Sequence, residues 1–138
     1  MKKGFTLVEL LAVLVILAII ATISFPIVSN VLEKSEKKAY DQQIKEFEKA
    51  AKNFETNNSN LLIQIDENDE IQNISCYISL DTLKAGGYLE DKEIINPMDD
   101  SSMDNAVIDL QYDAGSNQYK YVVHVDGNSN LTECEIVK

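Results

Sequence analysis

The residue in this sequence with the clearest chemical consequence is Glu9, because it is an acid at the start of a long apolar run. No charged side chain occurs between Leu10 and Val28. A carboxylate near a membrane interior costs at least a few kcal/mol unless it is protonated, paired or functional. If the chain is cut after Gly4, the new amino group on Phe5 lies four residues from this acid. In a helical assembly, the carboxylate of one subunit could then pair with the amine of another, and burial would make that pairing register-specific.

The apolar run is long enough to cross a membrane as a helix. From Phe5 to Val28 a helix rises roughly 36 Å at 1.5 Å per residue, against a hydrocarbon core of about 30 Å. Lys2 and Lys3 precede the run. By the positive-inside rule they place the short leader on the cytoplasmic side.

Two other interpretations of this segment explain less. A secretory signal peptide needs a small-residue cleavage site after its apolar core, and residues 21–23 (ATI) with Pro26 close behind offer a poor one. A plain single-pass anchor fits the length, but it leaves Glu9 without a role.

Residues 4–11 read GFTLVELL and resemble the cleavage and methylation signal of type IV prepilins and pseudopilins. The resemblance covers about the first thirty residues. It implies that a prepilin peptidase cuts between Gly4 and Phe5 and methylates the new terminus. It also implies that Glu9 is the acid used in subunit assembly. Pro26 falls where type IV pilins often carry a helix-loosening proline.

The helix is expected to continue beyond Pro26, which should kink it by removing a backbone donor and crowding the preceding turn. An apolar stripe at four-three spacing follows and predicts one face of an amphipathic helix over residues 29–56. Its members are Tyr40, Ile44, Phe47, Ala51 and Phe54. The turn-forming residues 57–60 end it. We therefore predict one helix of about 50 residues packed on a head. The stripe is too short to favour a coiled-coil stalk.

The rest of the chain predicts a small α+β head over residues 57–138. Alternation of period two indicates strands at Ala106–Tyr112, Gln118–Asp126 and Leu131–Val137. The second of these is expected in the middle of the sheet, with Tyr119, Tyr121, Val123 and Val125 on one face. A further short strand is indicated around residues 74–80. The predicted fold is thus a long N-terminal helix on a small antiparallel sheet of about three to four strands.

Residues 80–89, LDTLKAGGYL, predict a brief helix that Ser79 caps and two glycines end. The segment is similar to the leucine-rich turn and glycine-tyrosine-leucine of heads in Gram-positive pilins, although this chain has a second glycine before the tyrosine. The similarity implies a packing role for Leu80, Leu83, Tyr88 and Leu89.

The chain contains two cysteines, Cys76 and Cys134, so a single intramolecular pairing exists. A bridge would close a loop of about 58 residues and contribute roughly 4 kcal/mol to stability. The alternative is two buried free thiols, as expected in a reducing environment. The presumed extracellular location favours the disulfide.

Charge and motif content argue against several functions. From Asn57 onward there are sixteen acids and four lysines, a net charge of −12. Such a surface repels phosphate backbones, so no nucleic-acid partner is expected. The sequence has no nucleophile elbow, phosphate loop or metal-ligand spacing. We therefore expect no catalytic residues, no metal and no cofactor. The acidic loops 66–70 and 99–105 are expected to be solvated. Some secretion pseudopilins hold calcium in a loop before their last strands, and this resemblance makes the second loop the better candidate for calcium. His124, the single histidine, is expected at the sheet surface.

The expected domains are a leader at residues 1–4, a membrane or filament-core helix at 5–28, an amphipathic helix at 29–56 and the head at 57–138. By the resemblance, the chain is a non-enzymatic type IV pilus subunit of Gram-positive type. Its partners would be other pilins, a prepilin peptidase and the assembly machinery. It would lie in the membrane before assembly and at the cell surface after assembly. A pseudopilin of a secretion or DNA-uptake system, and a membrane-anchored binding module, are the alternatives.

Overall fold

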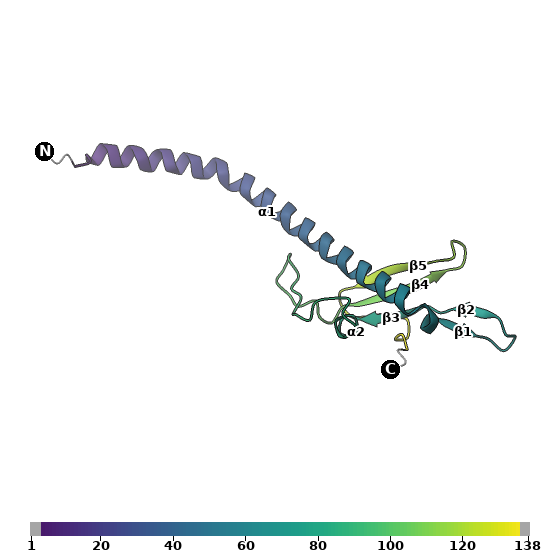
Figure 1. Cartoon of the computed structure of the whole chain (residues 1–138). Helices are drawn as coiled ribbons and strands as arrows, with labels where there is room; N and C mark the ends of the chain where they lie inside the picture. The colour runs from purple at the N-terminus through teal and green to yellow at the C-terminus, as the bar shows by residue number, and fades with distance from the viewer. Residues whose placement is uncertain (1–3, 136–138) are drawn as a thin grey trace. The chain divides into compact units, whose positions relative to one another are not determined.

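The structure is a computed structural model that describes residues 4–135. Its contacts divide the chain into two compact units, Met1–Lys38 and Ala39–Lys138. Helix α1, Leu7–Asn57, contributes to both units (Figure 1).

The first unit consists of the N-terminal part of α1, whose side chains are exposed throughout the apolar run. An 18-residue window of this helix has a mean hydropathy of 2.9 and no buried residue. By length and composition the helix is therefore able to cross a membrane. Pro26 lies inside α1 without ending it. The kink predicted at this proline stays a prediction.

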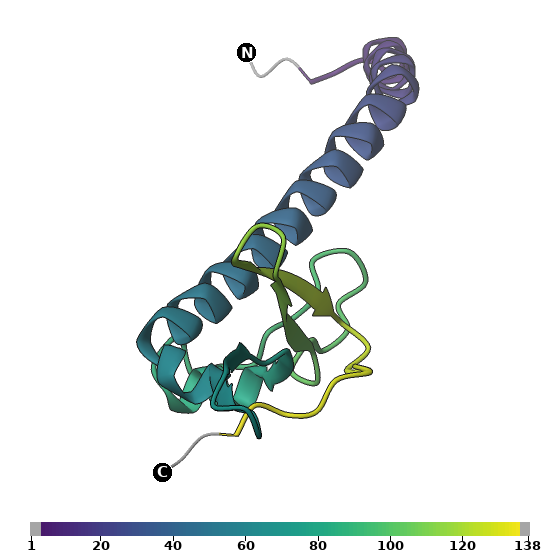
Figure 2. The same cartoon turned by 90° about the vertical axis from the view of Figure 1, so that its right-hand side faces the viewer.

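In the second unit, α1 packs its predicted apolar stripe into the head. Phe47, Ala51 and Phe54 are buried together with Ala50, and Tyr40 and Ile44 pack partly buried against the same core. Figure 2 shows the strands of the larger sheet lying against this part of the helix. The amphipathic helix is confirmed, and its partner is the head rather than a coiled-coil stalk.

The head contains two antiparallel sheets. After the short 3-10 helix η1, Ser59–Leu62, strands β1 (Ile63–Ile65) and β2 (Ile71–Asn73) form a two-stranded hairpin. The larger sheet has the order β3-β4-β5. Its strands are Cys76–Ser79, Val107–Asp113 and Gln118–His124. The predicted α+β architecture, a long N-terminal helix on small antiparallel sheets, is confirmed.

The prediction that Gln118–Asp126 forms the middle strand is wrong, because β4 is central and β5 is an edge. β4 pairs with β3 through Ile108 and Ile78, and with β5 through Ile108 and Val123. The buried residues of β4 are consecutive at its start, as expected for a strand covered on both faces. The predicted inner face of β5 is confirmed, since its alternate residues pack against the core. They are Tyr119, Tyr121 and Val123, followed by Val125.

The predicted strand Leu131–Val137 is also wrong over the described residues, while residues 136 and 137 lie outside them. Up to residue 135, this segment makes only an isolated parallel bridge between Glu133 and Tyr77. Tyr77 N donates to Thr132 O at 2.9 Å, and Cys134 N donates to Tyr77 O at 2.8 Å. Both edges of β4 are already occupied. The segment instead lies along the outer edge of β3, which is four residues long.

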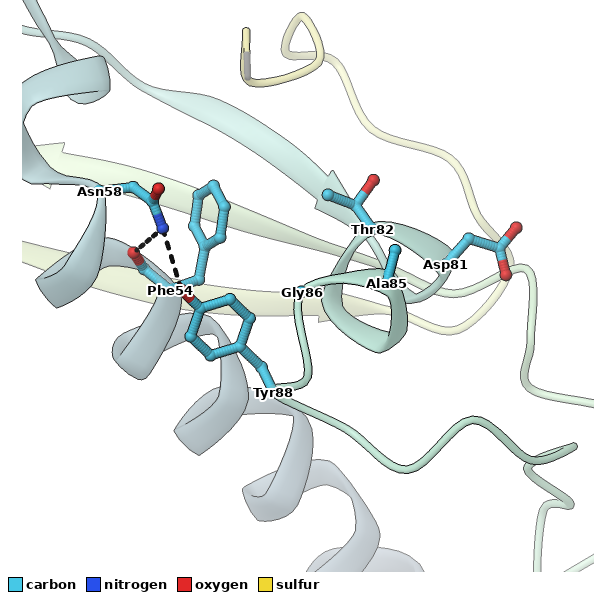
Figure 3. A pocket seen from close by; sticks show the side chains of 7 residues that line it. All are labelled: Phe54, Asn58, Asp81, Thr82, Ala85, Gly86 and Tyr88. Carbon is cyan, nitrogen blue, oxygen red and sulfur yellow. Dashed lines mark hydrogen bonds between the residues drawn. The ribbon is translucent and has the colours of Figure 1, made fainter. Parts of the chain in front are cut away.

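The short helix α2, Leu80–Ala85, begins and ends as predicted. The hydroxyl of Ser79 accepts a hydrogen bond from the Thr82 amide at 3.3 Å, which satisfies a free donor of the first turn. Gly86 follows the last turn, and Gly87 adopts a positive φ of 79°. Beyond them Tyr88 packs edge-on against Phe54, with ring centroids 5.8 Å apart (Figure 3).

Candidate functional site

The candidate functional site is the N-terminal segment that contains Gly4, Phe5 and Glu9. Gly4 and Phe5 precede the first residue of α1, Leu7, and have no regular secondary structure. The Phe5 side chain is 94% exposed, and a Cβ placed on Gly4 would meet no atom within 4 Å. The peptide bond between Gly4 and Phe5 is therefore open to an enzyme in this structure.

Thr6 and Glu9 form a reciprocal capping box at the start of α1. Glu9 Oε2 accepts hydrogen bonds from the Thr6 amide at 3.0 Å and from the Thr6 hydroxyl at 3.3 Å. In return, the Glu9 amide donates to Thr6 Oγ1 at 3.2 Å. These bonds satisfy amide groups that the first turn of a helix leaves without partners. The positive end of the helix dipole adds a favourable interaction with the carboxylate.

The capping box makes Thr6 part of the site, a role that the sequence interpretation did not assign. The signal was present in the pattern Thr-x-x-Glu immediately before an apolar helical run. The charge of Glu9 in an apolar run indicates a partner on another chain and does not by itself indicate a bond within the first turn. The structure shows that the acid also has a partner three residues away.

One oxygen of the Glu9 carboxylate stays available for another donor. All the side-chain hydrogen bonds that Glu9 accepts within residues 4–135 go to Oε2. The carboxylate thus has protein donors that lower its cost in an apolar environment, and a second oxygen that can accept from an amine.

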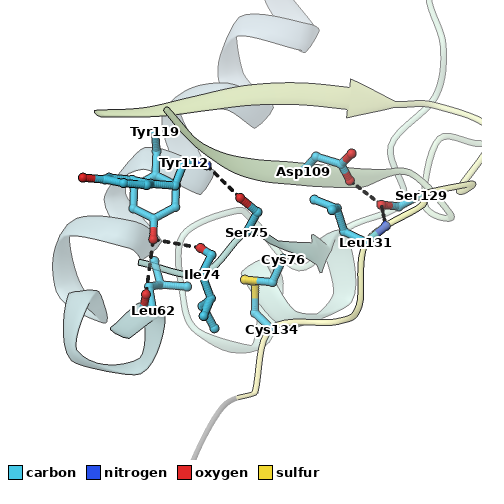
Figure 4. The surroundings of a disulfide bond; sticks show 10 residues. All are labelled: Leu62, Ile74, Ser75, Cys76, Asp109, Tyr112, Tyr119, Ser129, Leu131 and Cys134. Atoms are coloured by element: carbon cyan, nitrogen blue, oxygen red, sulfur yellow. Dashed lines mark hydrogen bonds between the residues drawn. A yellow bond between two sulfur atoms is a disulfide. The ribbon is translucent and has the colours of Figure 1, made fainter. Parts of the chain in front are cut away.

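The two predicted disulfide residues lie together in the head. Cys76 at the start of β3 and Cys134 near the C-terminus are joined by a disulfide, and both side chains are buried (Figure 4). The Tyr119 hydroxyl lies nearby and donates to Ile74 O at 2.9 Å. Burial raises the pKa of Tyr119 to about 12, so this hydroxyl stays a donor at neutral pH.

His124 is partly exposed and belongs to a hydrogen-bonded network around the buried Asp109. His124 Nε2 donates to Asp109 Oδ2 at 2.9 Å, while the hydroxyl of Ser129 donates to Oδ1 of the same carboxylate. The acid lies between the histidine and the serine. The histidine therefore does not contact the serine oxygen, as a general base activating a nucleophile would. The network instead ties the loop after β5 to β4, and Leu131 N donates to Ser129 Oγ in turn.

In the acidic loop 99–105, the carboxylates of Asp99 and Asp104 accept hydrogen bonds from protein donors. Asp99 Oδ1 accepts from the amide and hydroxyl of Ser101, and these bonds lower the pKa of Asp99. Asp104 Oδ1 accepts from Lys84 Nζ at 2.8 Å and from the Ile94 amide at 3.1 Å. Within residues 4–135, no group of three or more histidines, cysteines or acids is placed to hold a metal ion.

The head also has an open pocket of about 530 Å³ between the end of α1 and α2. It is lined by Phe54, Asn58, Asp81, Thr82, Ala85, Gly86 and Tyr88 (Figure 3). Asn58 Nδ2 donates to the Tyr88 hydroxyl at 3.1 Å and to Phe54 O at 2.9 Å, so these polar atoms are already paired within the wall.

Comparison with known proteins identifies the N-terminal segment. Residues 1–25 match the family model described as the prokaryotic N-terminal methylation motif. This motif is the class III signal of type IV pilins and pseudopilins, so the predicted resemblance is confirmed for this part of the chain. No curated protein and no solved structure matches the chain significantly.

The signal has direct consequences for the class of protein. It is the signal that type IV pilin and pseudopilin precursors carry, and the proteins of that class are structural subunits. It implies processing by a prepilin peptidase and assembly into a pilus-type polymer. Together with the long apolar helix, it fits anchoring in the membrane before assembly.

Proposed function

We propose that this chain is the precursor of a type IV pilus subunit, cleaved after Gly4 and N-methylated at Phe5. The observation that carries the proposal is the methylation motif at residues 1–25, which includes the start of an exposed apolar helix long enough to span a membrane. The exposed position of the Gly4–Phe5 peptide bond supports cleavage there. The packed head at the other end of α1 supports a structural role.

In the proposed mechanism, Glu9 gains a second partner during assembly. Before assembly its carboxylate accepts from Thr6 of the same chain, which lowers the cost of holding it in lipid. During polymerisation the free oxygen accepts from the amine on Phe5 of a neighbouring subunit. Because both charges lie among apolar helices, a subunit out of register would leave two unpaired charges, at a cost of several kcal/mol. The pairing thus selects one register.

The proposed destination of the head is the cell surface. An outer domain must be stable without a large core, and the buried Cys76–Cys134 disulfide supplies a covalent constraint suited to an oxidising environment. The net charge of −12 on residues 57–138 keeps such a surface soluble and discourages unspecific association. Adhesion, motility and biofilm formation are the roles that a filament of this kind serves.

A pseudopilin of a type II secretion or DNA-uptake apparatus is the second candidate, because the same signal directs that class of subunit. The chemistry is shared, and the filament would be short. A single-pass membrane-anchored binding module is the third. That candidate predicts an uncut leader and no effect of removing the charge of Glu9.

The experiment that tests the proposal compares Glu9→Gln with Thr6→Ala in cells that make the protein. Glutamine serves as well as glutamate in a capping box, so Glu9→Gln keeps the cap and removes only the charge. Thr6→Ala keeps the charge and removes the cap, at about 1 kcal/mol. We expect Glu9→Gln to be cleaved normally and to form no filaments. Thr6→Ala should still assemble.

Mass spectrometry of the recovered protein measures cleavage and methylation, and electron microscopy of sheared surface fractions measures filaments. A mature chain that begins at methylated Phe5 is expected in the wild type and in both variants. If the wild-type chain keeps residues 1–4, or if Glu9→Gln assembles as the wild type does, the proposed function is wrong.

A further inference from the structure

The β1–β2 hairpin exposes an apolar patch on an otherwise acidic head. Ile65 and Ile71 are register partners, so both side chains lie on one face of the hairpin. They are 68% and 70% exposed, and Ile63 on the same strand is 39% exposed. Figure 1 shows the hairpin extending away from the three-stranded sheet of the same unit.

The hairpin has little to stabilise it within the head. β1 and β2 pair with each other and not with the larger sheet. A two-stranded hairpin is marginally stable in water by itself, and burying its apolar face against another surface stabilises it. An exposed apolar patch bordered by charges is the usual composition of a protein contact surface.

The turn of the hairpin is strongly acidic and is held in one conformation. Asp66 Oδ1 accepts from the amides of Asn68 and Glu70 at 2.8 and 2.9 Å, which lowers the pKa of Asp66 and closes the turn. Glu67, Asp69 and Glu70 make no ion pair with any part of residues 4–135. The hairpin thus presents unpaired negative charge beside its isoleucines.

A surface of opposite charge lies on the first unit, directly after the predicted membrane span. Val31, Lys34 and Lys38 follow three-four spacing and therefore share one face of α1, whereas Glu33 and Glu36 lie on another face. Val31 is 62% exposed. The two lysines make no ion pair in the part of the chain that the structure describes.

We propose that the β1–β2 hairpin of one copy docks on the Val31–Lys38 face of a second copy. Ile65 and Ile71 would cover Val31, and the acids of the turn would pair with Lys34 and Lys38. The inference rests on the proposed function, because the polymer brings copies together. Charge selects this occupant: the acidic turn is repelled by nucleic acid and by anionic lipid surfaces, and it is attracted to the basic helix face.

The test places a photo-activated benzoylphenylalanine probe at Ile65 in the full-length protein assembled in cells. We expect a covalent dimer, with the cross-link mapped by mass spectrometry to residues 27–38 of the second copy. The same probe at Met98, which is also exposed on the head, should give no link to that segment. A link to another region, to lipid, to another protein or within one chain would overturn the proposal, as would no link.

Charge reversal gives an independent measure of the same contact. Lys34→Glu with Lys38→Glu should reduce the cross-link from Ile65 about tenfold, since two attractive pairs become repulsive. Adding Glu67→Lys and Glu70→Lys should restore it. The matched control, Asp91→Lys with Glu93→Lys, makes the same charge change elsewhere on the head and should restore nothing. Equal recovery by both pairs would contradict a specific contact.

A second probe separates failure of this inference from failure of the proposed function. Benzoylphenylalanine at Val13 lies in the exposed apolar part of α1 and reports helix–helix packing in a polymer. Dimers from Val13 without dimers from Ile65 would show that the copies assemble through a different head contact. No dimers from either site, with no filaments in the sheared fraction, would contradict the polymer itself.

Discussion

Glu9 combines two requirements that are separate in most proteins. As the third residue of α1 it completes a capping box with Thr6, and in the proposed assembly it would need a cation to offset the cost of a charge in an apolar run. The geometry assigns one carboxylate oxygen to the first task and leaves the other for the second. An acid at this position is therefore tolerable in the single chain and specific in a polymer.

Gly127 is the glycine whose replacement should be most damaging to the head. Its φ is +77°, and a Cβ at this position would lie 2.6 Å from the backbone oxygen of Asn105. Gly87 has nearly the same φ, +79°, but open space around it. We expect Gly127→Ala to lower the free energy of unfolding by about 3 kcal/mol, and Gly87→Ala by about 1 kcal/mol.

Near-UV circular dichroism of the six tyrosines, all of which lie after residue 39, measures this difference during urea unfolding in detergent. The two substitutions add the same methyl group at the same backbone conformation. Equal losses would show that the loop after β5 can move away from Asn105, contrary to the prediction.

The ion pair between Lys84 and Asp104 should make stability depend on pH in the acid range. Lys84 lowers the pKa of Asp104 below its ordinary value of 3.8, mainly through the hydrogen bond from Nζ. A group with a lowered pKa in the folded state stabilises at higher pH, and this contribution is lost as pH falls through the lowered value. We expect Lys84→Met to cost about 1 kcal/mol at pH 7 and little at about pH 3.

Unfolding by urea at the two pH values measures this effect, with Lys92→Met as the control. Lys92 pairs with Glu90 on the exposed surface, where an ion pair contributes little. A cost for Lys84→Met that is the same at both pH values would mean that packing, and not the charge pair, accounts for it.

At the scale of elements, the C-terminal segment shows how a sequence pattern can be satisfied in a different way. Residues 131–135 alternate as a strand would, but their backbone bonds go to a single residue of β3, Tyr77. The disulfide and the Asp109–Ser129 hydrogen bond then hold the segment at the edge of the sheet. A covalent bond and a side-chain hydrogen bond thus take the place of the backbone hydrogen bonds of a regular strand pair.

Removing the disulfide should therefore release the C-terminal segment and destabilise the head. The closed loop spans 58 residues, and its loss in Cys76→Ala with Cys134→Ala should cost about 4 kcal/mol on the chain-entropy model. Urea unfolding and amide exchange at Tyr77 measure the two effects. Reduction of the wild type should reproduce them and leave the double variant unchanged. A wild type that is equally stable when reduced would contradict the prediction.

At the scale of the whole molecule, charge is unevenly distributed along the chain. The net charge is −11, yet residues 34–52 contain six of the twelve lysines, while residues 57–138 contain sixteen acids. Copies that meet head to helix bring opposite charges together, whereas two heads repel each other. This distribution favours ordered association over unspecific aggregation.

The same charge predicts that the protein does not bind DNA on its own. We expect a Kd weaker than about 10⁻⁴ M for duplex DNA at physiological salt, because few cations face a large excess of acids. Fluorescence anisotropy with labelled duplex, at several salt concentrations, measures this. Tighter binding that weakens steeply with salt and is lost in Lys34→Glu would assign a nucleic-acid role to the basic face of α1.

The sequence by itself determined the features that depend on neighbouring residues along the chain. They are the apolar run with its acid, the spacing of Gly4, Phe5 and Glu9, the helical stripe of α1, and the alternation that sets the faces of β5. Each is local, since a helix or a strand face follows from periods of 3.6 or 2 residues. The capping box is equally local, so the role of Thr6 could have been predicted from the spacing of Thr6 and Glu9.

Only the tertiary structure decided which strands are neighbours and which partners the polar residues of the head bind. Alternation says which side of a strand faces the core, but pairing is made with residues far away in the chain. The central place of β4, the bridge of Glu133 to Tyr77 and the burial of Asp109 between His124 and Ser129 all depend on such distant contacts. These contacts form only when the chain has folded, so no local stretch of the sequence predicts them.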